Sequence, residues 1–188
     1  MDSEKKYRIS LFFSVLSLVV SGVAAYFTYS GNKLQETNFI KAVQPRISIV
    51  PQADINHNGI GFYFYNDGPG VGYIENLIIT DMRGKSFDLS DTSEKKPAIA
   101  LEDITGFSHD CLRSGFPKKG SSVSVGTMEP LITLSSPITK PECIKHINDM
   151  VEYTTGNQYN FEAVLIYNSS YGKRYEYSFP SNITKELD

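Results

Sequence analysis

The sequence predicts a mainly β fold, a β-sandwich domain, attached to one N-terminal transmembrane helix. Two observations carry this prediction. The chain of 188 residues has one long uncharged apolar stretch, and it lies near the N-terminus. Behind it, short alternating apolar runs recur between turns rich in Gly, Asn and Ser, a pattern typical of short strands. The 12 Tyr and 11 Phe also favour strands over helices.

Residues 9–29 form the predicted membrane-spanning helix, after a flank of residues 1–8. They carry no charge, and at about 1.5 Å per residue a helix of this length crosses a hydrocarbon core of roughly 30 Å. A cleaved signal peptide is the alternative, because Val23-Ala24-Ala25 offers small residues to a signal peptidase. The apolar stretch continues beyond this position through Phe27, which favours a retained anchor.

The charges around this helix predict its orientation. Lys5, Lys6 and Arg8 precede the helix, whereas Lys33 and Lys41 follow it closely. The positive-inside rule therefore favours a cytoplasmic N-terminus and a domain outside the cytoplasm. In a bacterium this places the protein in the cell membrane, which is the inner membrane of a Gram-negative cell.

Small and hydroxylated residues recur along one side of the same helix, at spacings of three and four. Such a face lets membrane helices approach closely and share hydrogen bonds, so it predicts association with itself or with another membrane protein. The alternative is that each hydroxyl bonds to the carbonyl of its own helix four residues earlier. The residues of this small-residue face are Ser10, Ser14, Ser17, Ser21, Ala25 and Thr28.

The domain is predicted to span residues 45–188, after a polar helical linker over residues 30–44. Strands are expected where apolar residues alternate and turn residues flank them. A capping-box pattern and helical spacing predict one amphipathic helix over residues 140–153. The predicted strands are 46–50, 60–65, 72–80, 85–89, 161–167 and 174–179, with further short strands at 98–104, 123–125 and 131–134.

Several turns resemble those of a diffuse group of uncharacterised bacterial and phage proteins with one membrane anchor. The resemblance rests on the Gln44-Pro45-Arg46 strand start, the turn from Tyr65 to Gly70, and the hairpin from Tyr167 to Gly172. It implies an immunoglobulin-like sandwich and no particular activity. Residues 90–155 depart from such a sandwich, and we expect this insertion to carry the protein's own function.

Two short Cys and His pairs lie within this insertion, and they allow three interpretations. Cys111 and Cys143 are a candidate disulfide, because an even pair of cysteines in an exported domain favours a bridge. Both could instead be free buried thiols. With His109 and His146 they could also supply four tetrahedral zinc ligands. Taken separately, the two histidines are expected on the surface, and no other cofactor is expected.

The sequence favours a non-enzymatic binding or accessory module that is anchored in the membrane and acts through protein partners. Its net charge of −3 and the lack of a dense basic stretch argue against nucleic-acid binding. None of the common hydrolase, zinc-protease or dinucleotide-binding motifs is present, so no catalytic residue is predicted. The alternatives are a membrane-tethered metal-dependent enzyme and, from the resemblance, a defence or immunity-type membrane factor.

Overall fold

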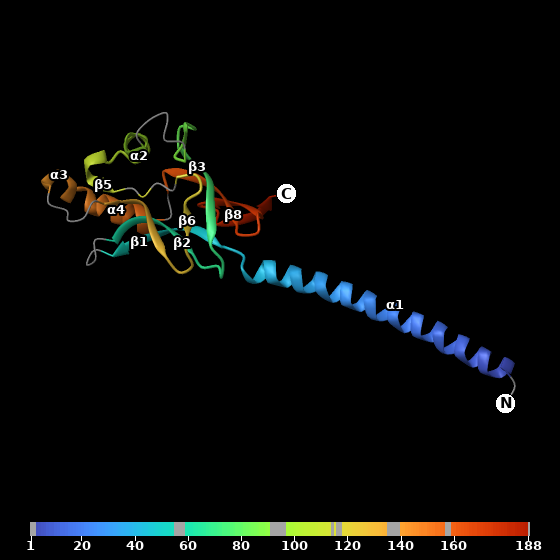
Figure 1. The fold of residues 1–188 in the computed structure, drawn as a ribbon. Helices are drawn as coiled ribbons and strands as arrows, with labels where there is room; N and C mark the ends of the chain where they lie inside the picture. Colours follow the sequence, from blue (N-terminus) through green and yellow to red (C-terminus); the bar gives the residue numbers. More distant parts are fainter. Residues whose placement is uncertain are drawn as a thin grey trace. The chain divides into compact units, whose positions relative to one another are not determined.

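The computed structural model describes residues 3–54, 59–90, 97–113, 115, 118–134, 140–156 and 159–187. They divide into two compact units, Met1–Ala42 and Val43–Asp188. The first unit is one continuous helix, α1 (Ser3–Ala42), which includes the predicted membrane span and most of the polar linker (Figure 1). Residues 55–58, between the strands predicted at 46–50 and 60–65, lie outside the described residues.

Helix α1 is long and apolar enough to cross a membrane, and none of its apolar segment is buried. Its large apolar side chains are 45–75% exposed between Ile9 and Tyr29, with Leu16 and Leu18 at the two extremes. Covering such a surface requires lipid or another protein, because the chain itself does not cover it. A signal sequence has the same properties, so the length and apolar character of α1 show that it can span a membrane and no more.

The second unit is built on two antiparallel β-sheets. Sheet A has the order β1 (Ile47–Asp54), β2 (Gly59–Asn66), β7 (Met128–Leu134) and β5 (Leu112–Arg113). Sheet B has the order β10 (Ile183–Leu187), β9 (Arg174–Phe179), β8 (Phe161–Ser169), β3 (Gly72–Asp81) and β4 (Ser86–Asp88), and β6 (Ser122–Val123) also pairs with β3. The described chain beyond α1 is therefore mainly β, as predicted.

The two sheets share one hydrophobic core, because alternate side chains of their strands point to the same interior. Strand β8 shows this period of two clearly, since Phe161, Ala163, Leu165 and Tyr167 are buried and Glu162 is exposed. Sheet A contributes the buried side chains of Ile47, Ile49, Phe62, Phe64, Leu131 and Ile132 to the same cluster. The alternating runs that predicted these strands thus also identify the core face of each one.

Two buried tyrosines link sheet B to the edge strand of sheet A. The Tyr167 hydroxyl accepts a hydrogen bond from the Ile47 amide at 3.4 Å, and the Tyr177 hydroxyl donates one to the Ile49 carbonyl at 3.4 Å. Both hydroxyls therefore find partners although their rings are buried. They also occupy backbone groups of β1 that have no neighbouring strand, which protects this edge from further pairing.

The turn between β2 and β3 holds the start of the domain in place. Asn66 is fully buried and uses its complete side-chain hydrogen-bonding capacity. Its Nδ2 donates to the carbonyls of Gly70 and Val123 at 2.8 and 2.9 Å. Its Oδ1 accepts from the amides of Arg46 and Gly68, both at 3.1 Å. One side chain thus joins the entering chain, its own turn and β6 of the other sheet.

Three helices of the insertion, together with a short 3₁₀ turn, lie at one end of the β domain (Figure 1). They are α2 (Pro97–Thr105), η1 (His109–Cys111), α3 (Pro141–Ile144) and α4 (His146–Thr155). The strand predicted at 98–104 is wrong, because this run forms α2. Its apolar residues Leu101 and Ile104 are buried three residues apart, a spacing that puts both on one face of a helix but on opposite faces of a strand. The helix predicted over 140–153 is divided at Lys145 into α3 and α4.

Candidate binding pocket

A disulfide fastens the two halves of the insertion. Cys111 at the end of η1 is bonded to Cys143 in α3, with their Cα atoms 5.3 Å apart, a normal separation for such a bridge. Both residues are buried, with Cys143 only 4% exposed. The bridge connects the chain that leaves α2 to the chain that enters α4. It therefore limits how far these two segments can separate.

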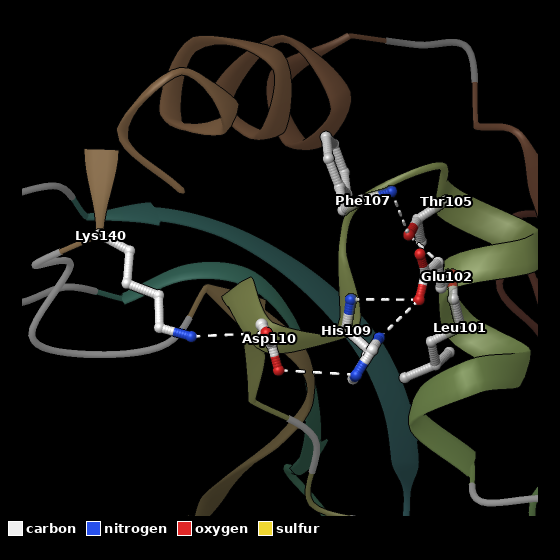
Figure 2. A network of polar contacts seen from close by, with 7 residues as sticks. All are labelled: Leu101, Glu102, Thr105, Phe107, His109, Asp110 and Lys140. Carbon is white, nitrogen blue, oxygen red and sulfur yellow. Dashed lines mark hydrogen bonds and ion pairs between the residues drawn. The ribbon is translucent and has the colours of Figure 1, made fainter. Parts of the chain in front are cut away.

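A surface network surrounds the Cys111 end of this bridge (Figure 2). The His109 Nδ1 atom lies 2.7 Å from Glu102 Oε2, and its Nε2 atom lies 3.5 Å from Asp110 Oδ1. Asp110 Oδ2 in turn lies 3.5 Å from Lys140 Nζ. These side chains are 43–60% exposed, so each contact contributes little to stability by itself. Together they connect α2, η1 and the start of α3.

The proposed zinc ligands are not gathered into one set. The two thiols are joined in the disulfide, so neither is available as the thiolate that zinc requires. The imidazoles have different neighbours, since His109 contacts Glu102, whereas the His146 ring stands edge-to-face with Phe107 at 5.1 Å. Across the described residues, no three His, Cys, Asp or Glu side chains lie close enough together to hold a metal ion.

An open pocket of about 720 Å³ lies between the end of α2 and helix α4. One wall is the segment that leads from α2 to η1, and the other wall is one side of α4. Gly156 and Asn160, which lie between α4 and β8 in the chain, also line the pocket. Its described lining residues are Thr105, Gly106, Phe107, His146, Asp149, Glu152, Tyr153, Gly156 and Asn160.

The amphipathic pattern of α4 decides which side chains face this pocket. Met150 and Thr154 are buried one turn apart, and Ile147 and Val151 also pack toward the domain. The remaining side of the helix presents Asp149 and Glu152, three residues apart, to the pocket. The sequence thus places a carboxylate pair on α4 by the same spacing that buries its apolar face.

Phe107 forms the opposite wall, and local hydrogen bonds fix its position. The Thr105 hydroxyl donates to the Leu101 carbonyl at 2.7 Å and accepts from the Phe107 amide at 3.2 Å, which ends α2 and turns the chain (Figure 2). The Phe107 ring is 6% exposed and packs in a cluster with Met150. It lies perpendicular to Tyr153, with centroids 6.3 Å apart.

Tyr153 forms the floor between these walls. Its hydroxyl accepts a hydrogen bond from the Asn160 amide at 3.0 Å. Burial raises the pKa of Tyr153 to about 12, and this hydrogen bond opposes the rise only in part. The phenol therefore stays neutral at physiological pH. Tyr153 therefore provides an aromatic surface in the pocket, and its hydroxyl is already hydrogen-bonded to the Asn160 backbone amide.

His146 is the polar group of the pocket that lacks a hydrogen bond. Its side chain is 14% exposed, and its buried Nδ1 atom has no hydrogen-bond partner among the described residues. The Asp149 Oδ2 atom lies 3.6 Å away, which is too long for a hydrogen bond. The expectation that His146 is a surface histidine is therefore wrong, because it begins α4 against the Phe107 ring.

Sequence reasoning singled out His109, Cys111, Cys143 and His146 but missed Phe107, Asp149, Glu152 and Tyr153. Phe107 follows a segment that was predicted as a strand, so its position opposite α4 could not be anticipated. The carboxylate pair could have been found, because Asp149 and Glu152 share a face in any helix over this segment. Their proximity to Phe107 depends on the tertiary fold.

The small-residue face of α1 shows local hydrogen bonds. The Ser14 hydroxyl donates to the Ser10 carbonyl at 3.0 Å, and the Thr28 hydroxyl donates to the Ala24 carbonyl at 2.9 Å. These two hydroxyls thus bond within their own helix, as the alternative to helix–helix association expects. A bond of this kind leaves the hydroxyl oxygen able to accept from a neighbouring helix, so it is compatible with association as well.

No family model, no curated protein and no solved structure matches this chain.

Proposed function

We propose that this protein is a non-enzymatic binding module, anchored in a membrane by α1 and acting through a protein partner. The observation that supports it best is the open pocket between Phe107 and α4. Its two walls come from segments that the Cys111–Cys143 bridge connects, so the shape of the pocket is maintained without a ligand. Preorganisation of this kind reduces the entropic cost of binding.

The chemistry of the pocket favours binding over catalysis. Its described lining contains no serine or cysteine that could act as a nucleophile next to His146. Its Thr105 hydroxyl is committed to two hydrogen bonds that end α2. Aromatic walls with a few exposed polar groups are common where proteins bind a protruding side chain of a partner.

The proposal includes an immunoglobulin-like class for the β domain and a location outside the cytoplasm. Two antiparallel sheets around one core support the first, and the basic residues before the apolar segment support the second. A phosphatase that is active only outside the cytoplasm, fused after Asp188, tests the location. Activity is expected, whereas an inactive but well-expressed fusion would contradict an exported domain.

Site-specific photocrosslinking tests the binding function. A photoreactive phenylalanine analogue replaces Glu152 at the pocket in the full chain, expressed in its native membranes. The control carries it at Met82, which is 75% exposed in the turn between β3 and β4. We expect one protein, identified by mass spectrometry in independent preparations, to be linked from position 152 and not from position 82. Equal labelling from both positions, or none from position 152, would overturn the proposal.

A further inference from the structure

We propose that the pocket between Phe107 and α4 receives an arginine side chain of the protein partner. This inference rests on the binding function proposed above and names the group that the pocket recognises. It follows from three properties of the described lining, namely its charge, its aromatic walls and its unused hydrogen-bond acceptors.

The charge of the described lining is negative. Asp149 and Glu152 are its two carboxylates, and it contains no Lys or Arg. The Asp149 side chain is 62% exposed and lies 3.6 Å from His146 Nδ1, and Glu152 is exposed on the same side of α4. By contrast, two carboxylates in the first half of the insertion have lysine neighbours, since Asp103 lies 3.3 Å from Lys85 Nζ and Asp110 lies 3.5 Å from Lys140 Nζ. The carboxylates of Asp149 and Glu152 on α4 can therefore bind a positively charged ligand in the pocket.

The walls suit a flat cation rather than a metal ion. The partly exposed ring of Tyr153 lies in the lining with the carboxylates, and the buried Phe107 ring stands perpendicular to it and edge-to-face with the His146 ring. A guanidinium group is planar, stacks on aromatic rings and offers a fork of N–H donors to carboxylates. A metal ion needs a compact group of ligands, and the described part of the chain holds no group of three such side chains.

The carboxylates of the described lining are strong hydrogen-bond acceptors. The Thr105 hydroxyl and the Tyr153 hydroxyl already have partners, and the Asn160 amide already donates to Tyr153. The carboxylates of Asp149 and Glu152 remain for N–H donors, which a guanidinium supplies and an anionic or purely apolar ligand does not. The Nδ1 atom of His146 lies 3.6 Å from Asp149 Oδ2. A ligand that binds the Asp149 carboxylate should therefore change the environment of the His146 ring.

The test uses the full chain in lipid nanodiscs with ¹³C-labelled methionine methyl groups. Met150 is buried in α4 against Phe107 and reports on the pocket, whereas Met82 and Met128 are exposed elsewhere and serve as internal controls. The probe is Nα-acetyl-arginine methylamide. The matched probe is the citrulline analogue, which has the same shape and no charge. We expect a saturable shift of the Met150 methyl signal with arginine and not with citrulline.

Removal of the two charges provides the second arm. The double variant Asp149→Asn/Glu152→Gln should weaken arginine binding about tenfold or more, equivalent to at least about 1.4 kcal/mol. The control variant Asp67→Asn removes an exposed carboxylate in the turn between β2 and β3 and should bind as the wild type does. Unchanged Met82 and Met128 signals establish that each variant is folded.

Equal shifts with arginine and citrulline, or equal affinity in the double variant and the wild type, would overturn the inference. These failures are distinguishable from failure of the binding function. Position-specific crosslinking from residue 152 without an arginine effect would refute the ligand class and leave the binding module intact. Loss of the crosslink would refute the binding module itself.

Discussion

At the scale of single residues, the side chain of Asn66 connects three parts of the domain. Its side chain bonds to the chain that enters the domain, to its own turn and to β6. Gly68 and Gly70 complete this arrangement, because a Cβ atom at either position would collide with backbone atoms of Val43 to Arg46. The turn was predicted from its Asn, Asp and Gly content, but the buried role of Asn66 was not.

Replacement of Asn66 by Ala should lower the free energy of unfolding by at least about 3 kcal/mol, because each buried group left without a partner costs about 1–3 kcal/mol. Urea unfolding of the full chain in detergent micelles measures the change. Asn168→Ala is the matched control, since the Asn168 Oδ1 atom has no hydrogen-bond partner, and it should cost less than about 1 kcal/mol. Equal losses in both variants would contradict the role assigned to Asn66.

Asp81 makes stability depend on pH. Its side chain is 4% exposed, and its Oδ1 atom accepts hydrogen bonds from the backbone amides of Lys85 and Arg83 at 2.8 and 2.9 Å. The hydrogen bond from the Lys85 amide is the main cause that lowers the pKa of Asp81, and the contacts with Arg83 add to it. A lowered pKa in the folded state means that the unfolded chain binds the proton more readily. The stabilisation is therefore present above the ordinary aspartate pKa and is lost as the pH falls through the folded-state value.

We expect the wild type to be more stable than Asp81→Asn at about pH 6, and we expect this difference to shrink steadily toward about pH 2. Urea midpoints of the two proteins, measured side by side across this range, give the result. The difference between the proteins is the relevant quantity because other carboxyl groups titrate in both. Parallel curves would show that Asp81 does not contribute in this way.

At the scale of elements, the insertion is where sequence reasoning succeeded least. The apolar runs of β1, β2, β3, β8 and β9 alternate with period two and predicted their strands, because one face of each is buried and the other is not. The run at α2 was predicted as a strand from its apolar content, but its buried residues Leu101 and Ile104 are three apart, which is helical spacing. Strand β10 was missed because its described residues are almost all exposed, so no apolar alternation marks it.

The pocket is a property of how these elements pack, which explains why only parts of it could be predicted. The helical spacing of α4 fixes the direction of Asp149 and Glu152 from the sequence alone. The meeting of Phe107 with α4 depends on the path between α2 and η1 and on the bridge from Cys111 to Cys143. Neither the path nor the pairing follows from local propensity, since cysteine spacing allows a bridge without requiring it.

Removal of this bridge should destabilise the domain and loosen the pocket. The cysteines are 32 residues apart, and the chain-entropy relation assigns a loop of this length roughly 3–4 kcal/mol. The double variant Cys111→Ala/Cys143→Ala should lose about that much in urea unfolding, and its Met150 methyl signal should broaden. A reductant should have no further effect on this variant. An unchanged unfolding midpoint would show that the bridge does not stabilise the insertion.

At the scale of the whole molecule, the chain combines two units that meet different surroundings. Helix α1 has exposed apolar side chains over its apolar segment, whereas the β domain buries its apolar side chains between two sheets. Composition and charge were sufficient to predict this division, because an uncharged apolar stretch long enough to span a membrane as a helix is rare in a soluble domain. They were not sufficient to predict a partner for either unit.

Association through α1 gives a prediction at this scale. The triple variant Ser14→Leu/Ser17→Leu/Ser21→Leu enlarges the small-residue face and should abolish crosslinked oligomers or co-purified membrane partners. The control, Val19→Leu/Val20→Leu/Val23→Leu, places the same three side chains on the opposite face and should retain them. Crosslinking in intact membranes followed by gel analysis measures both. Unchanged assembly in the serine variant would exclude this face as an interface.

The pairing of β3 with β8 has a consequence for the synthesis of the protein. Gly72 lies opposite Ser169, and Asp81 lies opposite Phe161, so the centre of sheet B can form only after the ribosome has synthesised residues 161–169. Until then β3 lacks its longest partner, and folding of the domain has to follow synthesis of β8. A chain that stops before Phe161 would present β3 with an open edge. Premature termination should therefore yield a substrate for quality-control proteases and not a shortened, working domain.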